Sequence, residues 1–94
     1  LLKLLLPKEF TLSPAYPNPF NPTTTLSFAL PVTSNVLLEV YDINGRLINE
    51  LIKSNMDAGY HSVIWNADNN ASGVYFVKMV AGDFVNTQKL MLVK

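Results

Sequence analysis

The chain has 94 residues, no cysteine, and seven basic residues against seven acidic ones, which gives a formal net charge of zero. This length is that of one small domain, and 49% hydrophobic residues are enough to form its core. The absence of cysteine excludes disulfides and thiolate chemistry. Because the basic residues are balanced and form no cluster, we expect no nucleic-acid partner.

The chain opens with a short apolar run that ends at Pro7 and contains the leucines Leu1, Leu2, Leu4, Leu5 and Leu6. The run is far shorter than the roughly 20 residues of a membrane-spanning helix. It also lacks the length and the cleavage site of a complete signal peptide. We expect residues 1–7 to be a linker or a docking strand, and residues 8–94 to form the folded domain.

Proline and glycine interrupt the rest of the chain at short intervals, and the apolar residues between them alternate with a period of two. This period is typical of half-buried β-strands. It predicts strands near residues 9–12, 25–30, 36–41, 46–52, 60–66, 74–80 and 84–93, with weaker alternation in 46–52. About seven strands with a turn about every 8–12 residues predict an all-β fold, an immunoglobulin-like antiparallel β-sandwich.

The alternation also predicts which side chains share a face of each strand. The sets are Leu26, Phe28 and Leu30; Val36, Leu38 and Val40; His61, Val63 and Trp65; and Tyr75, Val77 and Met79. Trp65 is expected in the core. Between the strands, Asn44 and Gly45 both tolerate the positive φ of a primed hairpin turn, and residues 68–73, ending at Gly73, are turn-forming throughout.

A proline-rich segment spans residues 15–22 and reads Ala15-Tyr16-Pro17-Asn18-Pro19-Phe20-Asn21-Pro22. Each proline fixes its own φ and favours extended geometry in the residue before it, so the segment is stiff without ladder hydrogen bonds. We expect a rigid crossover in which Tyr16 and Phe20 cover one end of the sandwich. The alternative is a proline-rich ligand, which would normally be polar and free rather than flanked by strands.

The sequence offers no catalytic constellation, and we expect neither enzymatic activity nor a cofactor. His61 is the only histidine, and its shared face with Val63 and Trp65 indicates a packed side chain. A triad needs three cooperating groups, and the four scattered glycines form no phosphate-cradling loop.

The carboxylates suggest ordinary structural roles. Glu39 and Glu50 are expected opposite each other across the hairpin, on the outer face of a small sandwich that implies no glycosidase cleft. Asp42 and Asn44, and separately residues 68–70, resemble oxygen-ligand loops, but they lack the spaced acidic residues and closing glutamate of a helix–loop–helix calcium site. We favour turns over metal sites at both places, and the sequence leaves calcium binding at a surface turn open.

Several blocks together resemble the C-terminal sorting domains of the type IX (Por) secretion system. They comprise residues 6–10, 16–24, 40–46, 58–65, 72–76 and 88–94, and they include the motif residues Pro17, Asn18, Pro19, Phe20, Asn44, Gly45, Trp65, Gly73 and Tyr75. The resemblance covers nearly the whole chain from Leu6, and the combination is specific. A similar pattern occurs in the immunoglobulin-like domain of flagellar hook-capping proteins.

Two features depart from the family pattern. Relatives often carry a longer, glycine-rich insertion after Trp65, whereas residues 66–72 are compact here, which trims a surface loop. Such domains are normally appended to a catalytic or adhesive domain, and these 94 residues include none. We therefore expect either that the cargo has been removed or that the chain is itself the mature protein.

The resemblance implies a non-catalytic module that directs an exported protein through the type IX system, so that the protein is secreted or held at the outer-membrane surface of a bacterium. The implied partners are the secretion translocon and the surface-attachment machinery. We expect recognition at the last residues, Leu90, Met91, Leu92, Val93 and Lys94. A receptor could pair with this edge strand by strand addition or read its end carboxylate.

Two alternatives stay open. The leucine run at residues 1–6 could add as a strand to a neighbouring copy and build an oligomer or filament. A carbohydrate-binding sandwich would instead need exposed, coplanar aromatic rings, for which Tyr41, Tyr60 and Phe84 are the candidates.

Overall fold

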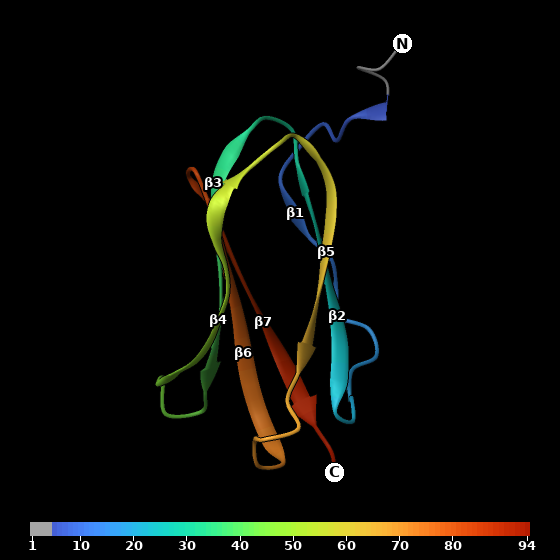
Figure 1. Ribbon diagram of the computed structural model, residues 1–94, viewed down its shortest axis with the longest axis vertical. Helices are drawn as coiled ribbons and strands as arrows, with labels where there is room; N and C mark the ends of the chain where they lie inside the picture. The colour runs from blue at the N-terminus through green and yellow to red at the C-terminus, as the bar shows by residue number, and fades with distance from the viewer. Residues whose placement is uncertain (1–4) are drawn as a thin grey trace.

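The computed structural model describes residues 5–94, and these residues contain seven strands. The strands are β1 (Thr11–Leu12), β2 (Thr23–Leu30), β3 (Ser34–Asp42), β4 (Leu47–Met56), β5 (Gly59–Asn66), β6 (Gly73–Ala81) and β7 (Phe84–Leu92). One antiparallel sheet has the order β1-β2-β5 and the other the order β4-β3-β6-β7. The two sheets face each other (Figure 1), which confirms the predicted all-β sandwich.

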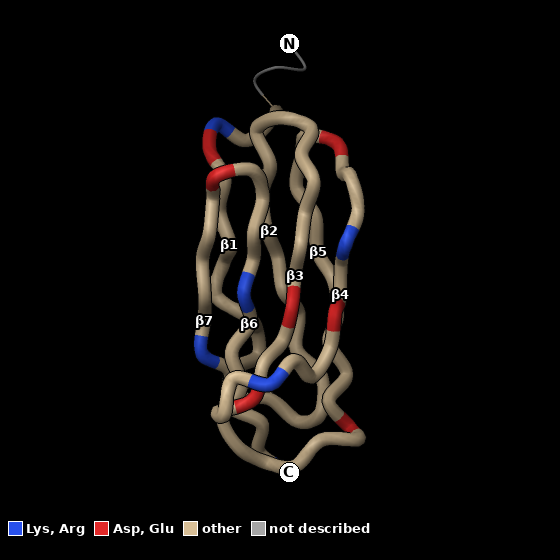
Figure 2. Tube along the Cα trace, turned by 90° about the vertical axis from the view of Figure 1, so that its left-hand side faces the viewer, with Lys and Arg blue, Asp and Glu red and all other residues tan. Residues whose placement is uncertain are grey.

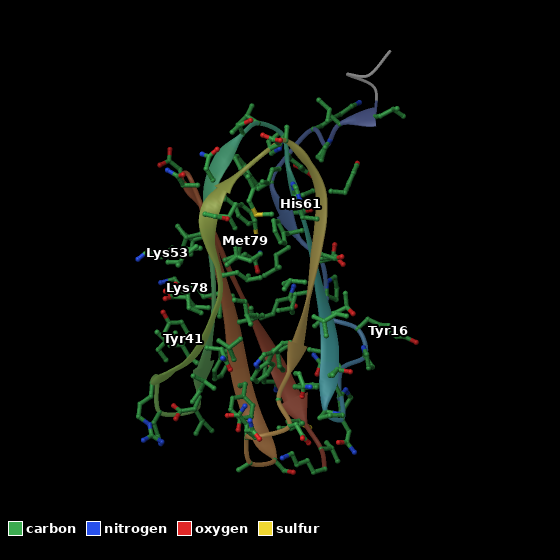
Figure 3. All side chains as sticks on the ribbon, viewed as in Figure 1. Tyr16, Tyr41, Lys53, His61, Lys78 and Met79 are labelled. Carbon is green, nitrogen blue, oxygen red and sulfur yellow. The ribbon has the colours of Figure 1, made fainter. Side chains whose placement is uncertain are left out.

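The core fills the space between the sheets, and the alternate residues predicted to share a face supply most of it. Its largest buried side chains are Leu26, Phe28, Leu30, Val36, Leu38, Val40, Trp65, Met79, Val77, Leu90 and Leu92. Met79 lies between the two layers in Figure 3. Full burial of one such side chain contributes about 1.5–3 kcal/mol, so this contact between the sheets is the main stabilising interaction of the fold.

Several observed strand bounds differ from the predicted ones by one to four residues, including those of β1 and β4. β1 comprises only two residues, since Phe10 leaves the strand and stacks on the ring of Phe84 at 5.7 Å. β4 continues to Met56 rather than ending at Ile52.

The weak alternation in β4 has a structural cause. Its ladder with β3 shifts register twice, and Leu51 and Ile48 are the residues left without a partner opposite them. Both side chains pack against the core. Each bulge lets an additional apolar residue reach the core at the cost of a regular period of two, and bulges also make an edge strand a poorer template for another strand.

The β3–β4 hairpin forms where Asn44 and Gly45 predicted it, but the predicted turn type is wrong. Gly45 has a φ of +82°, whereas Asn44 has no positive φ. The N–H of Gly45 donates to the carbonyl of Asp42 at 3.0 Å, and the N–H of Asp42 donates to the carbonyl of Arg46 at 2.9 Å. An ordinary β-turn is therefore followed by a left-handed glycine, which is the three-residue hairpin with a bulge.

The side chain of Asp42 explains this choice of turn. Its Oδ1 accepts the N–H groups of Asn44 (2.9 Å) and Arg46 (3.0 Å), and its Oδ2 accepts the Arg46 Nε–H at 2.9 Å. These bonds, chiefly that from the N–H of Arg46, lower the pKa of Asp42 below its ordinary value. A carboxyl whose pKa is lowered by folding stabilises the fold above its unfolded pKa of about 3.9, and this contribution is lost as the pH falls through the folded value.

We predict that Asp42→Asn is less stable than the wild type at neutral pH and that the difference shrinks as the pH falls from about 4 through the lower pKa of Asp42 in the folded protein, because the wild-type carboxylate becomes protonated over this range. Urea denaturation across this range measures the difference. Asp57→Asn, which removes an exposed carboxylate outside the hairpin, is the control at neutral pH. An advantage of the wild type that is equally large in acid would contradict the role given to ionised Asp42.

Candidate recognition site at the end of the last strand

The residues expected to be recognised divide between the core and the surface. Leu90 and Leu92 are buried, whereas Met91, Val93 and Lys94 are exposed. β7 ends at Leu92 and forms one edge of the four-stranded sheet. Of these five residues, only Met91, Val93 and Lys94 therefore offer their side chains to a partner while the strand stays folded.

The residues beyond the strand are held in place. The N–H of Val93 donates to the carbonyl of Phe20 at 3.0 Å, and the N–H of Lys94 donates to Ser72 Oγ at 3.0 Å. The Lys94 ammonium also donates to the carbonyl of Asp68 in the turn between β5 and β6. These bonds fix the end of the chain against two other segments.

The proline-rich segment pairs with the outer edge of β7. The N–H of Phe20 donates to the carbonyl of Met91 at 2.9 Å, and together with the bond from Val93 this makes a parallel bridge between Phe20 and Leu92. The C=O of Met91 and the N–H of Val93 are thus already used. The expectation of an open edge for strand addition is wrong here, because a segment more than 70 positions earlier occupies it.

Asn18 extends this ladder with its side chain. Its Nδ2 donates to the carbonyl of Lys89 and its Oδ1 accepts the N–H of Met91, both at 3.0 Å. A parallel neighbouring strand would make the same two bonds through its backbone. Pro17 and Pro19 have no N–H to donate, and the asparagine amide supplies both the donor and the acceptor of a peptide group. Asn18 therefore takes the place of a backbone residue opposite Leu90.

A second side-chain amide joins β7 to the other sheet. Gln88 Nε2 donates to the carbonyls of Leu12 (3.0 Å) and Ser13 (2.6 Å), and its Oε1 accepts the N–H of Ala15 at 3.1 Å. The chain from β1 through the proline-rich segment therefore runs along β7 and closes this side of the sandwich.

Phe20 and Tyr16 were predicted to cover one end of the sandwich together, but only Phe20 is buried. Phe20 is buried and its ring lies 5.5 Å from that of Trp65, so its predicted role as a cover of the sandwich is confirmed. Tyr16 is 80% exposed and projects away from the three-stranded sheet (Figure 3), so the same prediction is wrong for it. Its backbone bridges to Thr25 of β2, which turns its side chain to solvent.

The other motif residues shape the β5–β6 turn and its contact with the core. The Tyr75 hydroxyl donates to the carbonyl of Ala71 at 2.5 Å, the arrangement known in immunoglobulin sandwiches as a tyrosine corner. Trp65 packs edge-on against Tyr75 at 5.4 Å, and its Nε1 donates to Asn49 Oδ1 at 3.0 Å. Gly73 begins β6 with a φ of +151°, which side chains disfavour.

His61 and the two glutamates considered for catalysis belong to different sheets. His61 stacks on Phe28 at 5.4 Å, and its Nε2 lies 2.8 Å from the carbonyl oxygen of Asp57, so the packed histidine is confirmed. Glu39 pairs with Glu50 across the ladder, as predicted. The Tyr41 hydroxyl donates to Glu39, and this bond raises the pKa of Tyr41. Within residues 5–94, no three histidine or acidic side chains gather where they could hold a metal ion.

The aromatic residues considered for carbohydrate binding do not form a platform. Tyr41 projects from the four-stranded sheet (Figure 3), whereas Tyr60 belongs to β5 in the other sheet. The ring of Phe84 is covered by that of Phe10. Because the three rings lie on separate parts of the molecule, the coplanar arrangement that this alternative needs is absent among them.

The described part of the leucine run, Leu5 and Leu6, is exposed and belongs to no strand, and residues 1–4 lie outside the described residues. The predicted linker or docking role of residues 1–7 stays a prediction. Across residues 5–94 the structure has no helix with the length and hydrophobicity needed to cross a membrane.

Residues 14–94 match the family model of the secretion system C-terminal sorting domain, the Por secretion tail. The chain belongs to this family. No curated protein and no solved structure gives a significant match. The matched region begins at the proline-rich segment and runs through β7, so the two segments that pair in space stand at its two ends.

Membership of the family confirms the resemblance seen in the sequence motifs. The domain is a C-terminal sorting signal for type IX secretion, and it interacts with the secretion machinery. Sorting domains of this kind mark proteins that are exported and then attached to the cell surface or secreted. The family is not known as catalytic.

We predict that Asn18→Ala destabilises the domain by about 1–3 kcal/mol, because two hydrogen bonds of about 0.5–1.5 kcal/mol each are lost. Asn18→Asp should have an intermediate effect, since it keeps the acceptor for Met91 and loses the donor to Lys89. Urea denaturation measures the free energy of unfolding of both variants, and we expect its dependence on urea concentration to stay the same as in the wild type.

Asn21→Ala is the matched control, because Asn21 is an exposed asparagine of the same segment, also followed by a proline. If Asn18→Ala were as stable as Asn21→Ala, the side-chain amide would not be holding β7.

Proposed function

We propose that the sorting domain works entirely by being bound, without a reaction of its own, and that the exposed end of β7 is the surface that the translocon and the surface-attachment machinery contact. The surface comprises the side chains of Met91, Val93 and Lys94, next to the proline-rich segment that pairs with the end of β7. The observation that carries the proposal is that these side chains stay exposed while the backbone around them is fixed by hydrogen bonds.

A fixed backbone favours recognition because little conformational entropy is lost when a partner binds. The bonds from Asn18 and Phe20 hold Met91 and Val93 in extended geometry before any partner arrives. Met91 is 38% exposed and Val93 is 50% exposed, so both offer apolar area to a partner.

The partner is expected to read side chains rather than to add a strand at this place, since the N–H and C=O of Met91 and the N–H of Val93 are already bonded. Lys89 is exposed two residues before Met91 on the same face of the strand. An apolar strip that begins at one lysine and ends at another suits a partner surface with apolar contacts and acidic groups around them.

We predict that a reporter fused to the domain is exported by a bacterium with a type IX system, and that the double variant Met91→Asp/Val93→Asp accumulates inside the cell. Both positions are exposed, so the variant should fold; circular dichroism of the purified domain checks this. Removing residues 90–94 is a poorer test, because it also removes the buried Leu90 and Leu92.

Val85→Asp is the matched control, as Val85 is an exposed apolar residue at the other end of the same strand. Its reporter should be exported as well as the wild type. Normal export of the folded double variant would show that the machinery reads another surface.

A further inference from the structure

The charges of the domain are distributed unequally between its two sheets. The strands of the three-stranded sheet contain no Asp, Glu, Lys or Arg. The strands of the four-stranded sheet contain Glu39, Asp42, Glu50, Lys53, Lys78 and Lys89. In Figure 2 the strands of the sheet that faces the viewer carry both blue and red segments.

β5 is the edge of the uncharged sheet. It pairs with β2 over eight residues in one continuous register, and among the described residues no strand lies against its other edge. The edge of β7 is covered by the proline-rich segment over residues 89–93, and the edge of β4 is bulged and carries charges. β5 has none of these three protections, which natural edge strands use against pairing with other chains.

The register shows which backbone groups of β5 are free. The N–H of Ala67 donates to the carbonyl of Pro22, and hydrogen-bonded pairs recur at every second residue of an antiparallel ladder. On this pattern Val63 and Trp65 bond to β2, whereas Tyr60, Ser62 and Ile64 direct their N–H and C=O groups to the open edge. Thr25 lies opposite Ile64, and its backbone N–H and C=O bond to Tyr16 on the side away from β5, as this pattern requires.

The side chains at the same three positions are exposed. Tyr60 is 72% exposed and Ile64 is 65% exposed, with Ser62 between them. If a second β5 strand lay antiparallel with Ser62 opposite Ser62, Tyr60 of each copy would lie opposite Ile64 of the other. Pairs of an aromatic and a β-branched residue are among the favourable cross-strand pairs. No charge lies on the strand to oppose the approach.

We propose that the domain associates with a second copy of itself through antiparallel pairing of the two β5 edges about a two-fold axis at Ser62. The two three-stranded sheets then become one continuous six-stranded sheet. The contact is short compared with the roughly 1,600 Å² of a standard stable interface, so the association is weak and depends on concentration. It leaves the end of β7 free, and it is independent of the recognition proposed above.

Cysteine cross-linking tests the geometry directly, because the chain has no cysteine of its own. Residues opposite each other in a hydrogen-bonded antiparallel pair have Cα atoms about 5.5 Å apart, which a disulfide spans. Ser62→Cys should form a cross-linked dimer under mild oxidation, whereas Ser54→Cys on the exposed part of β4 should not. Tyr60→Cys and Ile64→Cys should cross-link with each other and not with themselves.

Charge substitution gives a second readout that does not need a disulfide. Since Ser62 meets itself across the axis, Ser62→Lys and Ser62→Glu should each sediment as monomers at concentrations where the wild type dimerises. An equal mixture of the two variants should dimerise again, which a folding defect would not allow.

A wild-type monomer at millimolar concentration, with no Ser62→Cys cross-link above that of Ser54→Cys, would overturn the proposal. A dimer that survives Ser62→Lys, or a mixture that stays monomeric, would overturn it as well, because another surface or another partner would then be involved.

Discussion

The pairing of the proline-rich segment with the outer edge of β7 is the constraint on which the rest of the structure depends. Asn18 and Phe20 bond to residues 89–93, and Gln88 bonds back to the chain that leaves β1. Through these bonds the beginning and the end of the domain hold each other. They also bring Phe20 against Trp65 and place Leu90 and Leu92 in the core. The contacts that stabilise this part of the domain therefore also hold the residues proposed for recognition.

This arrangement determines how a sorting signal can be read. An edge strand with free backbone groups would accept many extended segments, whereas the paired end of β7 offers only the side chains of Met91, Val93 and Lys94 on a fixed frame. Specificity then rests on the chemistry of a few side chains. β5 is the contrasting case, since it exposes backbone groups beside apolar side chains and carries no charge.

The sequence predicted the features that depend on neighbouring residues. Burial decides which way a strand side chain points, so the period of two located Leu26, Phe28 and Trp65 in the core. The turn at Asn44 was mispredicted, because the carboxylate of Asp42 stabilises a competing turn. The closure of β7 joins positions more than 70 residues apart and leaves no periodic signal. Its one local sign is an asparagine between two prolines, where a side-chain amide can replace the missing N–H groups.

Amide hydrogen exchange tests most directly whether the edge of the last strand is closed. The N–H groups of Met91 and Val93 donate to Asn18 and Phe20, so both should exchange slowly. The N–H of Thr87 faces the same side of β7, beyond the proline-rich segment, and should exchange faster. In Asn18→Ala, Met91 should lose its protection. If Met91 exchanged as fast as Thr87 in the wild type, the closed edge would be contradicted.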